Sequence, residues 1–230
     1  MATREDYITA IGQLVQGEIP LDEADKILAI NIALKAHSKR RPRVIVEDED
    51  GDGGFDYAIT GLEHWSDGFS VVKTVEYPVD DDDETPEVLQ DDAWMIYAKP
   101  SGEVLRFKEI SPTADEDFRV VYTALHTCTT SACTVKAYDT EPVQALAAAY
   151  FCDMLATYYA QSGDSSIGAD SVDHKSKAKE YAARAKAYRT IYFDHLGIAE
   201  GKTPAASISR DQDKKASWQS DKVTHKSKYR

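Results

Sequence analysis

The spacing of apolar residues predicts helices at both ends of the chain and strands in the middle. Near the N-terminus, apolar residues recur every three or four positions and predict a first helix with the stripe Tyr7, Ile8, Ile11, Leu14 and Val15. Thr3 and Asp6 resemble a capping box at its start, and Gly17 is a plausible end. A second helix is predicted between Pro20 and Pro42, on the apolar positions Leu21, Ala24, Ile27, Leu28, Ile32 and Leu34.

From about residue 43 the apolar period changes to two. Six short segments rich in β-branched and aromatic residues are predicted as strands: 43–47, 55–60, 69–77, 94–98, 103–108 and 118–126. The Lys99–Gly102 segment has Pro and Gly where a type I turn favours them, which predicts a hairpin. Strands of this number and length are typical of a small antiparallel sandwich or open barrel.

At Asp139 the period returns to that of a helix. A third helix is predicted there, with Pro142 in its first turn and the stripe Val143, Leu146, Tyr150, Met154 and Tyr158. A last helix is predicted over residues 172–196, ended by Gly197, with the apolar face Tyr181, Ala185, Tyr188, Tyr192 and Leu196.

These elements predict the α+β class. We expect a four-helix core of two N-terminal and two C-terminal helices, with an inserted small antiparallel β-sandwich or barrel and an extended C-terminal tail. The predicted boundaries are 1–41 plus 139–197 for the helical bundle, 42–138 for the β domain and 198–230 for the tail. In the tail, the apolar residues are too isolated to form a core.

Charge separates the tail from the rest of the chain. The whole chain has a net charge of −13, but residues 198–230 hold eight basic and four acidic residues. The preceding residues therefore carry a net charge of −17, which argues against a body that grips nucleic acid. No apolar run approaches the ~18 residues of a membrane helix, and the N-terminus lacks the pattern of a secretory signal.

The cysteine count does not suggest a disulfide framework. Cys128, Cys133 and Cys152 are few and odd in number, so we expect reduced thiols. Cys128 and Cys133 are spaced C-x4-C, but no second pair of zinc ligands follows.

Other motifs predict no catalytic or metal site. Asp48 opens a D-x-D-x-D-G sequence, but the twelfth position, where a calcium loop needs Glu, is Ile59, so we expect an acidic turn. Gly201-Lys202-Thr203 lacks the upstream Gly and preceding strand of a phosphate-binding loop. No nucleophile motif is found, and we expect no enzyme activity, no cofactor and no metal.

The order of motifs in the middle and the helical end resembles a viral family. The motifs are Trp65, Gly68-Phe69-Ser70, Val75-Glu76-Tyr77-Pro78, Leu105-Arg106-Phe107, Pro112, Val121-Tyr122-Thr123 and His126-Thr127, followed by a helix of alanines and tyrosines. Over roughly residues 5–197 the chain resembles head-to-tail connector (adaptor) proteins of tailed bacteriophages.

The resemblance implies a non-enzymatic virion protein of the phage neck. It implies a homo-oligomeric ring, often of twelve subunits, whose helices form the ring body. The ring would sit between the portal protein and a downstream stopper or tail protein, would let DNA pass, and would assemble in the host cytoplasm with no membrane involved. The C-terminal tail would reach the portal.

Candidate site residues follow from this resemblance together with charge and packing. The portal-docking tail would use a buried tryptophan and surrounding cations, as interface hot spots do: Arg210, Lys214, Lys215, Trp218, Lys222, Lys226, Tyr229 and Arg230. Packing within and between subunits is predicted for Ala145, Ala148, Ala149, Tyr181, Tyr188 and Tyr192. An acidic lumen that repels the DNA backbone would use Asp48, Asp50, Asp52, Asp81, Asp82 and Asp83.

Two alternatives remain open from the sequence. One is a different neck protein, a stopper or tail-completion protein, built on the same β domain. The other is a soluble β-sandwich that binds a ligand or acts as a hydrolase, which requires a concave aromatic pocket with a carboxylate pair of shifted pKa.

Overall fold

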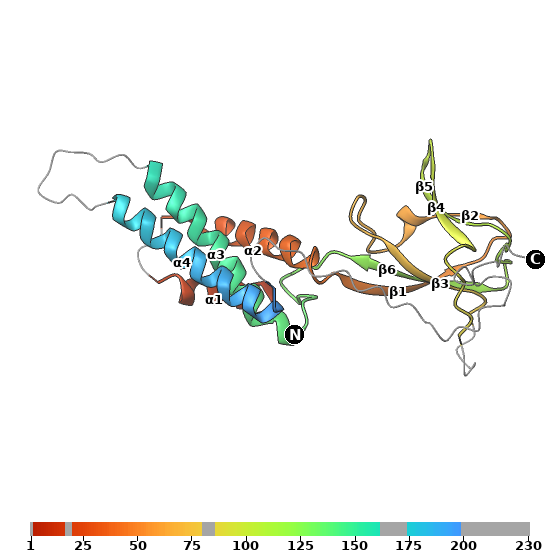
Figure 1. Cartoon of the computed structure of the whole chain (residues 1–230), viewed down its shortest axis with the longest axis horizontal. Coiled ribbons are helices and arrows are strands. Elements are labelled where there is room, and N and C mark those ends of the chain that lie inside the picture. The colour runs from red at the N-terminus through yellow and green to blue at the C-terminus, as the bar shows by residue number, and fades with distance from the viewer. Residues whose placement is uncertain (1, 17–19, 80–85, 162–173, 199–230) are drawn as a thin grey trace, which may run out of the picture.

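The structure, a computed structural model, describes residues 2–16, 20–79, 86–161 and 174–198. The helices are α1 (Arg4–Leu14), α2 (Glu23–Ser38), α3 (Ala137–Gln161) and α4 (His174–Leu196). The strands are β1 (Arg43–Asp50), β2 (Asp56–Ala58), β3 (Val72–Glu76), β4 (Trp94–Lys99), β5 (Gly102–Phe107) and β6 (Asp117–Ala124). The helices lie at one end of an elongated molecule and the strands at the other, which confirms the α+β class (Figure 1).

The N-terminal helices begin as their sequence predicts. Thr3 and Asp6 form the expected capping box of α1, and Asp22 and Asp25 form a second one at the start of α2. The predicted apolar stripes are partly wrong, because Leu14 is 36% exposed and Leu28 is 50% exposed. The buried face of α2 is instead Ala29, Ile30, Ala33, Leu34 and His37. In α2, therefore, the buried residues are those on the face that packs against α3, and they share only Leu34 with the predicted apolar stripe.

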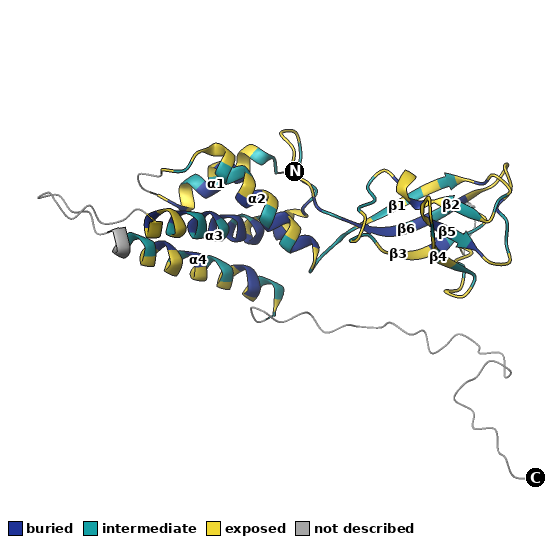
Figure 2. Cartoon of the chain, turned by 90° about the horizontal axis from the view of Figure 1, so that it is seen from above, coloured by how far each residue is buried: buried dark blue, intermediate teal, exposed yellow. Residues whose placement is uncertain are grey.

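Helix α3 lies between α4 and the pair α1 and α2 (Figure 2), and it contacts all three. Its middle is consequently buried on every side, and a single stripe does not describe it. Ala147, Ala148, Phe151 and Cys152 are completely buried, whereas Tyr158, predicted on the stripe, is 44% exposed. The helix also begins two residues before Asp139, which places Pro142 beyond its first turn. The alanines let neighbouring helices approach closely.

Helix α4 follows its prediction closely. Tyr181, Ala185 and Tyr192 are buried on one face, and the Tyr181 ring stacks on Tyr159 of α3 with ring centroids 5.6 Å apart. Gly197 ends the helix with φ +67°, a left-handed conformation that glycine adopts without steric cost.

The strands form two three-stranded antiparallel sheets. In the first sheet the order is β1-β6-β3, and in the second it is β2-β5-β4. The sheets face each other over one apolar cluster and do not close into a barrel, so the sandwich form of the prediction is the one observed. The β4–β5 hairpin is confirmed. β1 extends through Asp50, so Asp48 and Asp50 lie on a strand and not in the acidic turn that the sequence predicts.

Buried apolar residues fall into two clusters, one among the helices and one between the sheets. Cys128, Cys133 and Val135 belong to the helical cluster, although the sequence places them in the β domain. The division into domains 1–41 plus 139–197 and 42–138 stays a prediction. Almost all of the predicted tail lies outside the described residues, and so do Asp81, Asp82 and Asp83.

The expectation of reduced thiols is wrong for one pair of cysteines. Cys128 and Cys133 are joined by a disulfide, while Cys152 is free and buried. Backbone hydrogen bonds between Thr129 and Ala132 and between Thr127 and Thr134 fold this segment back on itself, so that the two cysteines lie opposite each other. This local hairpin, with no wider disulfide framework, brings the thiols together. Within the described part of the chain, no helix has the length and apolarity needed to span a membrane.

Candidate functional site

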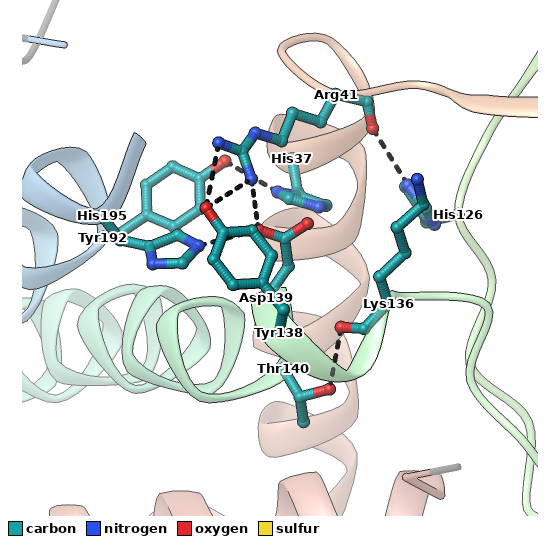
Figure 3. Close-up of polar contacts among 9 residues, drawn as sticks. All are labelled: His37, Arg41, His126, Lys136, Tyr138, Asp139, Thr140, Tyr192 and His195. Carbon is teal, nitrogen blue, oxygen red and sulfur yellow. Dashed lines mark hydrogen bonds and ion pairs between the residues drawn. The ribbon is translucent and has the colours of Figure 1, made fainter. Parts of the chain in front are cut away.

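Three helix ends meet at the buried carboxylate of Asp139, where the helices adjoin the β-strands (Figure 3). Asp139 is only 4% exposed. Its Oδ1 accepts a hydrogen bond from Arg41 Nη1 at 2.6 Å and one from His195 Nε2 at 2.8 Å. The Tyr138 hydroxyl accepts weaker contacts from the Arg41 guanidinium, and the Tyr138 ring packs on His195. We call this group, together with His37, His126 and Tyr192, the junction cluster.

The helix dipoles favour this arrangement of charges. Asp139 is the third residue of α3, at the end where the dipole favours an anion. His195 lies in the last turn of α4, and Arg41 follows the end of α2, where the dipole favours cations. The junction cluster therefore stabilises three helix termini with one buried ion-paired group.

Two histidines of the cluster are uncharged at neutral pH. His37 is 1% exposed, and its Nδ1 lies 3.0 Å from the Tyr192 hydroxyl. His126 Nε2 donates to the Arg41 carbonyl oxygen at 2.9 Å, and the two imidazole rings are 5.1 Å apart. Burial, with a smaller contribution from His126, lowers the pKa of His37 to about 4. Burial likewise lowers the pKa of His126.

The junction cluster holds both links between the helices and the sheets. Arg41 lies on the short connection from α2 to β1, and His126 follows β6 on the connection back to α3. A third anchor is Arg4 of α1, whose guanidinium donates two hydrogen bonds to the Cys128 carbonyl oxygen, at 3.2 and 2.9 Å. These contacts fix the direction in which the β-strands leave the helical bundle. No group of three His, Cys, Asp or Glu side chains in the described segments could hold a metal ion.

Apart from Tyr192, the residues of the junction cluster were not among the site residues predicted from the sequence. Arg41 and Asp139 are far apart in the chain, and no local pattern pairs them. The available signal was the charge at helix ends, since basic residues close α2 and an acid opens α3.

The neutral histidines make stability depend on pH, and we predict the sign. Between the ordinary histidine pKa of about 6.5 and the folded value of about 4, the unfolded chain binds more protons at His37 than the folded chain. Stability is therefore greatest above that window and falls as pH decreases. From pH 7 to pH 5, His37 should remove about 2 kcal/mol from the free energy of unfolding.

Urea denaturation at several pH values measures this dependence. The variant His37→Gln should show a flatter dependence of the free energy of unfolding on pH, whatever its stability at pH 7. The control variant His64→Gln, which replaces a partly exposed histidine in a loop, should keep the wild-type slope. Equal slopes in wild type and His37→Gln would contradict the prediction.

A second surface lies on the outer side of the β1-β6-β3 sheet, next to the junction. β1 pairs Val44 with Thr123 and Val46 with Val121, and the Thr123 amide bonds to the Val71 carbonyl oxygen. Residues paired across strands share a face, so these five side chains lie on one face of the sheet, which we call the valine face. Its members Val44, Val46 and Val71 are 49%, 59% and 61% exposed. The opposite side of β6 packs into the core between the sheets.

The acidic residues predicted for a lumen are partly neutralised. Asp48 accepts two hydrogen bonds from the Arg119 guanidinium, at 2.6 and 2.9 Å, on the same side of the sheet as the valine face. Asp50 is exposed at the end of β1, and Asp52 is exposed in the following turn, where it accepts from the Gly54 amide. Asp48 and Asp50 thus lie along one strand edge beyond the valine face. Their place in a lumen stays a prediction.

The residues predicted for subunit packing are placed inside the chain. Ala145, Ala148, Ala149, Tyr181 and Tyr192 are buried among the helices. Tyr188 is partly buried, and its hydroxyl donates to the Leu14 carbonyl oxygen at 2.7 Å. They pack one subunit, and a role between subunits stays a prediction. The tail residues Arg210 to Arg230 lie outside the described residues.

Between the two sheets lies a cavity of about 270 Å³. It is lined mainly by apolar side chains: Ala58, Ile59, Leu62, Leu105, Phe118 and Val120. Its lining includes one carboxylate, Glu49, and one phenol, Tyr57. Among the described residues, its lining therefore offers no carboxylate pair of the kind that the hydrolase alternative requires.

No family model matches the sequence, and no curated protein does. Among solved structures, a chain from the neck of an empty gene transfer agent particle with C6 symmetry is 15% identical, with a TM-score of 0.28, and covers 86% of this chain and 92% of that chain. A chain from the virion of a native gene transfer agent particle is 14% identical, with a TM-score of 0.27, and covers 82% and 92%.

A chain from the neck of the native particle with C12 symmetry is 17% identical, with a TM-score of 0.25, and covers 80% of this chain and 88% of that chain. TM-scores of this size are too low to assign a common fold.

Proposed function

We propose that this chain is a non-enzymatic structural protein of a phage-type virion neck. It assembles with further copies of itself into a head-to-tail adaptor ring, with twelve subunits as the expected number. The ring joins the portal protein to a downstream stopper or tail protein and lets DNA pass through its centre. The C-terminal tail, with Trp218 and its neighbouring cations, docks on the portal. The order of sequence motifs supports this assignment.

The observation that carries the proposal is the valine face. Its three most exposed valines lie on one face next to the junction cluster, whereas single exposed apolar residues elsewhere need no explanation. Val44 and Val46 are on β1 and Val71 directly precedes β3, with Val121 and Thr123 of β6 between them. A protein that acts alone gains nothing from such a face, but a ring needs one apolar patch per subunit that meets a different surface of the next copy. The junction cluster supports the same role. Every subunit of a ring must hold its helices and its sheets at the same angle to each other, and the junction cluster fixes that angle.

The acidic charge of the body supports passage of DNA without binding. Residues 1–197 carry a net charge of −17, and a surface of that sign repels the phosphate backbone. Asp50, which is exposed at the end of β1, and Asp52, which is exposed in the following turn, are candidates for the lumen. Carboxylates at these positions would repel the phosphates, so DNA would pass without binding to them.

Assembly on the cognate portal protein tests the proposal. The full-length chain, mixed with portal and followed by mass photometry and electron microscopy, should give a ring of adaptor subunits on the portal. Val46→Asp should weaken ring formation at least about tenfold, because a carboxylate in an apolar contact costs more than 1.4 kcal/mol. Val88→Asp is the matched control, since Val88 is similarly exposed at 53% but lies outside the valine face.

Removing residues 199–230 in the same assay should weaken attachment to the portal and leave the far-ultraviolet circular dichroism of the body unchanged. A chain that stays monomeric and unbound with portal at every salt concentration would refute the proposed function. If Val46→Asp formed rings as well as wild type, the valine face would have no role in the proposed function.

A further inference from the structure

Glu49 is a carboxylate that faces the cavity between the two sheets. It lies on the inner side of β1, opposite Phe118 of β6, and is only partly exposed. Its neighbours on β1 are satisfied: Glu47 accepts from the Tyr122 hydroxyl at 2.7 Å and from the Glu63 amide at 3.1 Å, and Asp48 is held by Arg119. Glu49 has no hydrogen bond or ion pair with any described residue.

The surroundings of Glu49 favour a cation. Burial raises the pKa of Glu49, and Glu47 and Asp50 add to the effect. The described lining of the cavity includes no Lys, Arg or His. A partly buried carboxylate without a partner is unfavourable, and a nearby positive charge removes that penalty. The remaining lining is apolar, which suits the methylene stem of a lysine or arginine side chain.

The cavity has the size for one side chain. Its volume of about 270 Å³ lies below the range of drug-sized ligand sites, which begins near 300 Å³. A small cavity with one carboxylate therefore fits a single cationic side chain of a polypeptide better than a free metabolite.

The chain itself contains a segment of matching chemistry. Residues 198–230 carry eight basic and four acidic residues, with lysines next to apolar residues at Trp218 and Val223. The described chain ends at Ile198, just after α4, and the last turn of α4 lies in the junction cluster through His195. The sheets begin directly beyond that junction (Figure 1). Residues 199–230 span at most about 110 Å when extended, which is ample reach.

We propose that in the free subunit the basic segment 199–230 of the same chain docks on the β-sandwich and places one lysine side chain in the inter-sheet cavity beside Glu49. Portal binding then takes this segment over, so that the tail stays bound within its own subunit until the portal is present. Only this last step rests on the proposed function; the contact with Glu49 does not involve the portal.

Zero-length crosslinking of the full-length chain tests the contact. A carbodiimide joins a carboxylate to a lysine amine only when the two touch, and peptide mass spectrometry identifies the pair. We expect a link from Glu49 to a lysine of the tail, with Lys214, Lys215, Lys222 and Lys226 as candidates. Glu49→Gln should abolish the link. Asp50→Asn is the matched control and should keep it, because Asp50 points to the opposite face of β1.

Mixing heavy-isotope and ordinary chains shows whether the link forms within one chain. Links within one isotopic species support the proposal, whereas equal formation of mixed links, or no Glu49 link at all, overturns it. As a second measurement, trypsin should cleave the tail of Glu49→Gln about fivefold faster than that of wild type, because loss of a weak ion pair raises the undocked population. Equal cleavage rates would also overturn the proposal, whereas a failure to bind portal would leave it standing.

Discussion

Replacing Asp139 with asparagine should lower the free energy of unfolding by about 3 kcal/mol at pH 7. The carboxylate is almost completely buried and is the shared acceptor of Arg41 and His195. Asparagine keeps the shape and one oxygen but removes the charge, so the Arg41 guanidinium remains in the junction cluster without its counter-ion. Breaking the buried side of an ion pair costs more than the pair contributes, because the Arg41 and His195 donors lose the carboxylate that they share, although the Arg41 side chain is itself 36% exposed.

Asp48→Asn provides the matched control for Asp139→Asn. Asp48 also binds an arginine, Arg119, in a two-point contact, but its side chain is 43% exposed. Water replaces such a contact readily, so the cost should stay below about 1 kcal/mol. Urea denaturation followed by circular dichroism measures both variants. Equal losses of stability in the two variants would show that Asp139 does not stabilise the junction as the structure indicates.

Local signals in the sequence predict the elements of this fold well. Each of the six predicted strand segments overlaps one observed strand, because alternation of β-branched and aromatic residues reflects a sheet with one buried side. The capping box at Thr3 and the end of α4 at Gly197 are equally local, since each depends on residues within one turn. The tyrosine face of α4 follows because that helix packs on one neighbour.

Features that depend on distant residues were not predictable. α3 contacts three helices, so its central alanines and Phe151 are buried on sides that the apolar period does not mark. Leu28 is exposed because the alanine-rich side of α2, not its largest side chain, meets α3. The junction cluster joins Arg41 to Asp139, 98 positions later, and a buried Asp139 looks in sequence like one more acid among forty.

Truncation of Phe118 should separate the unfolding of the sheets from that of the helices. The Phe118 ring packs between Tyr57 and Phe107, with centroid distances of 4.5 and 5.3 Å, and is 1% exposed. Phe118→Ala should therefore cost about 3–5 kcal/mol within the sheet cluster. The helical cluster shares no buried residue with it.

Tryptophan fluorescence and circular dichroism report the two parts separately. Trp65 and Trp94 pack against the sheet cluster, and a Trp218→Phe background removes the signal of the tail. In that background, Phe118→Ala should lower the fluorescence midpoint in urea and leave the helical dichroism midpoint nearly unchanged. Leu155→Ala, at a completely buried position of α3, should do the reverse. If either variant shifted both midpoints together, the junction would couple the two clusters into one cooperative unit, and the predicted domain division would be wrong.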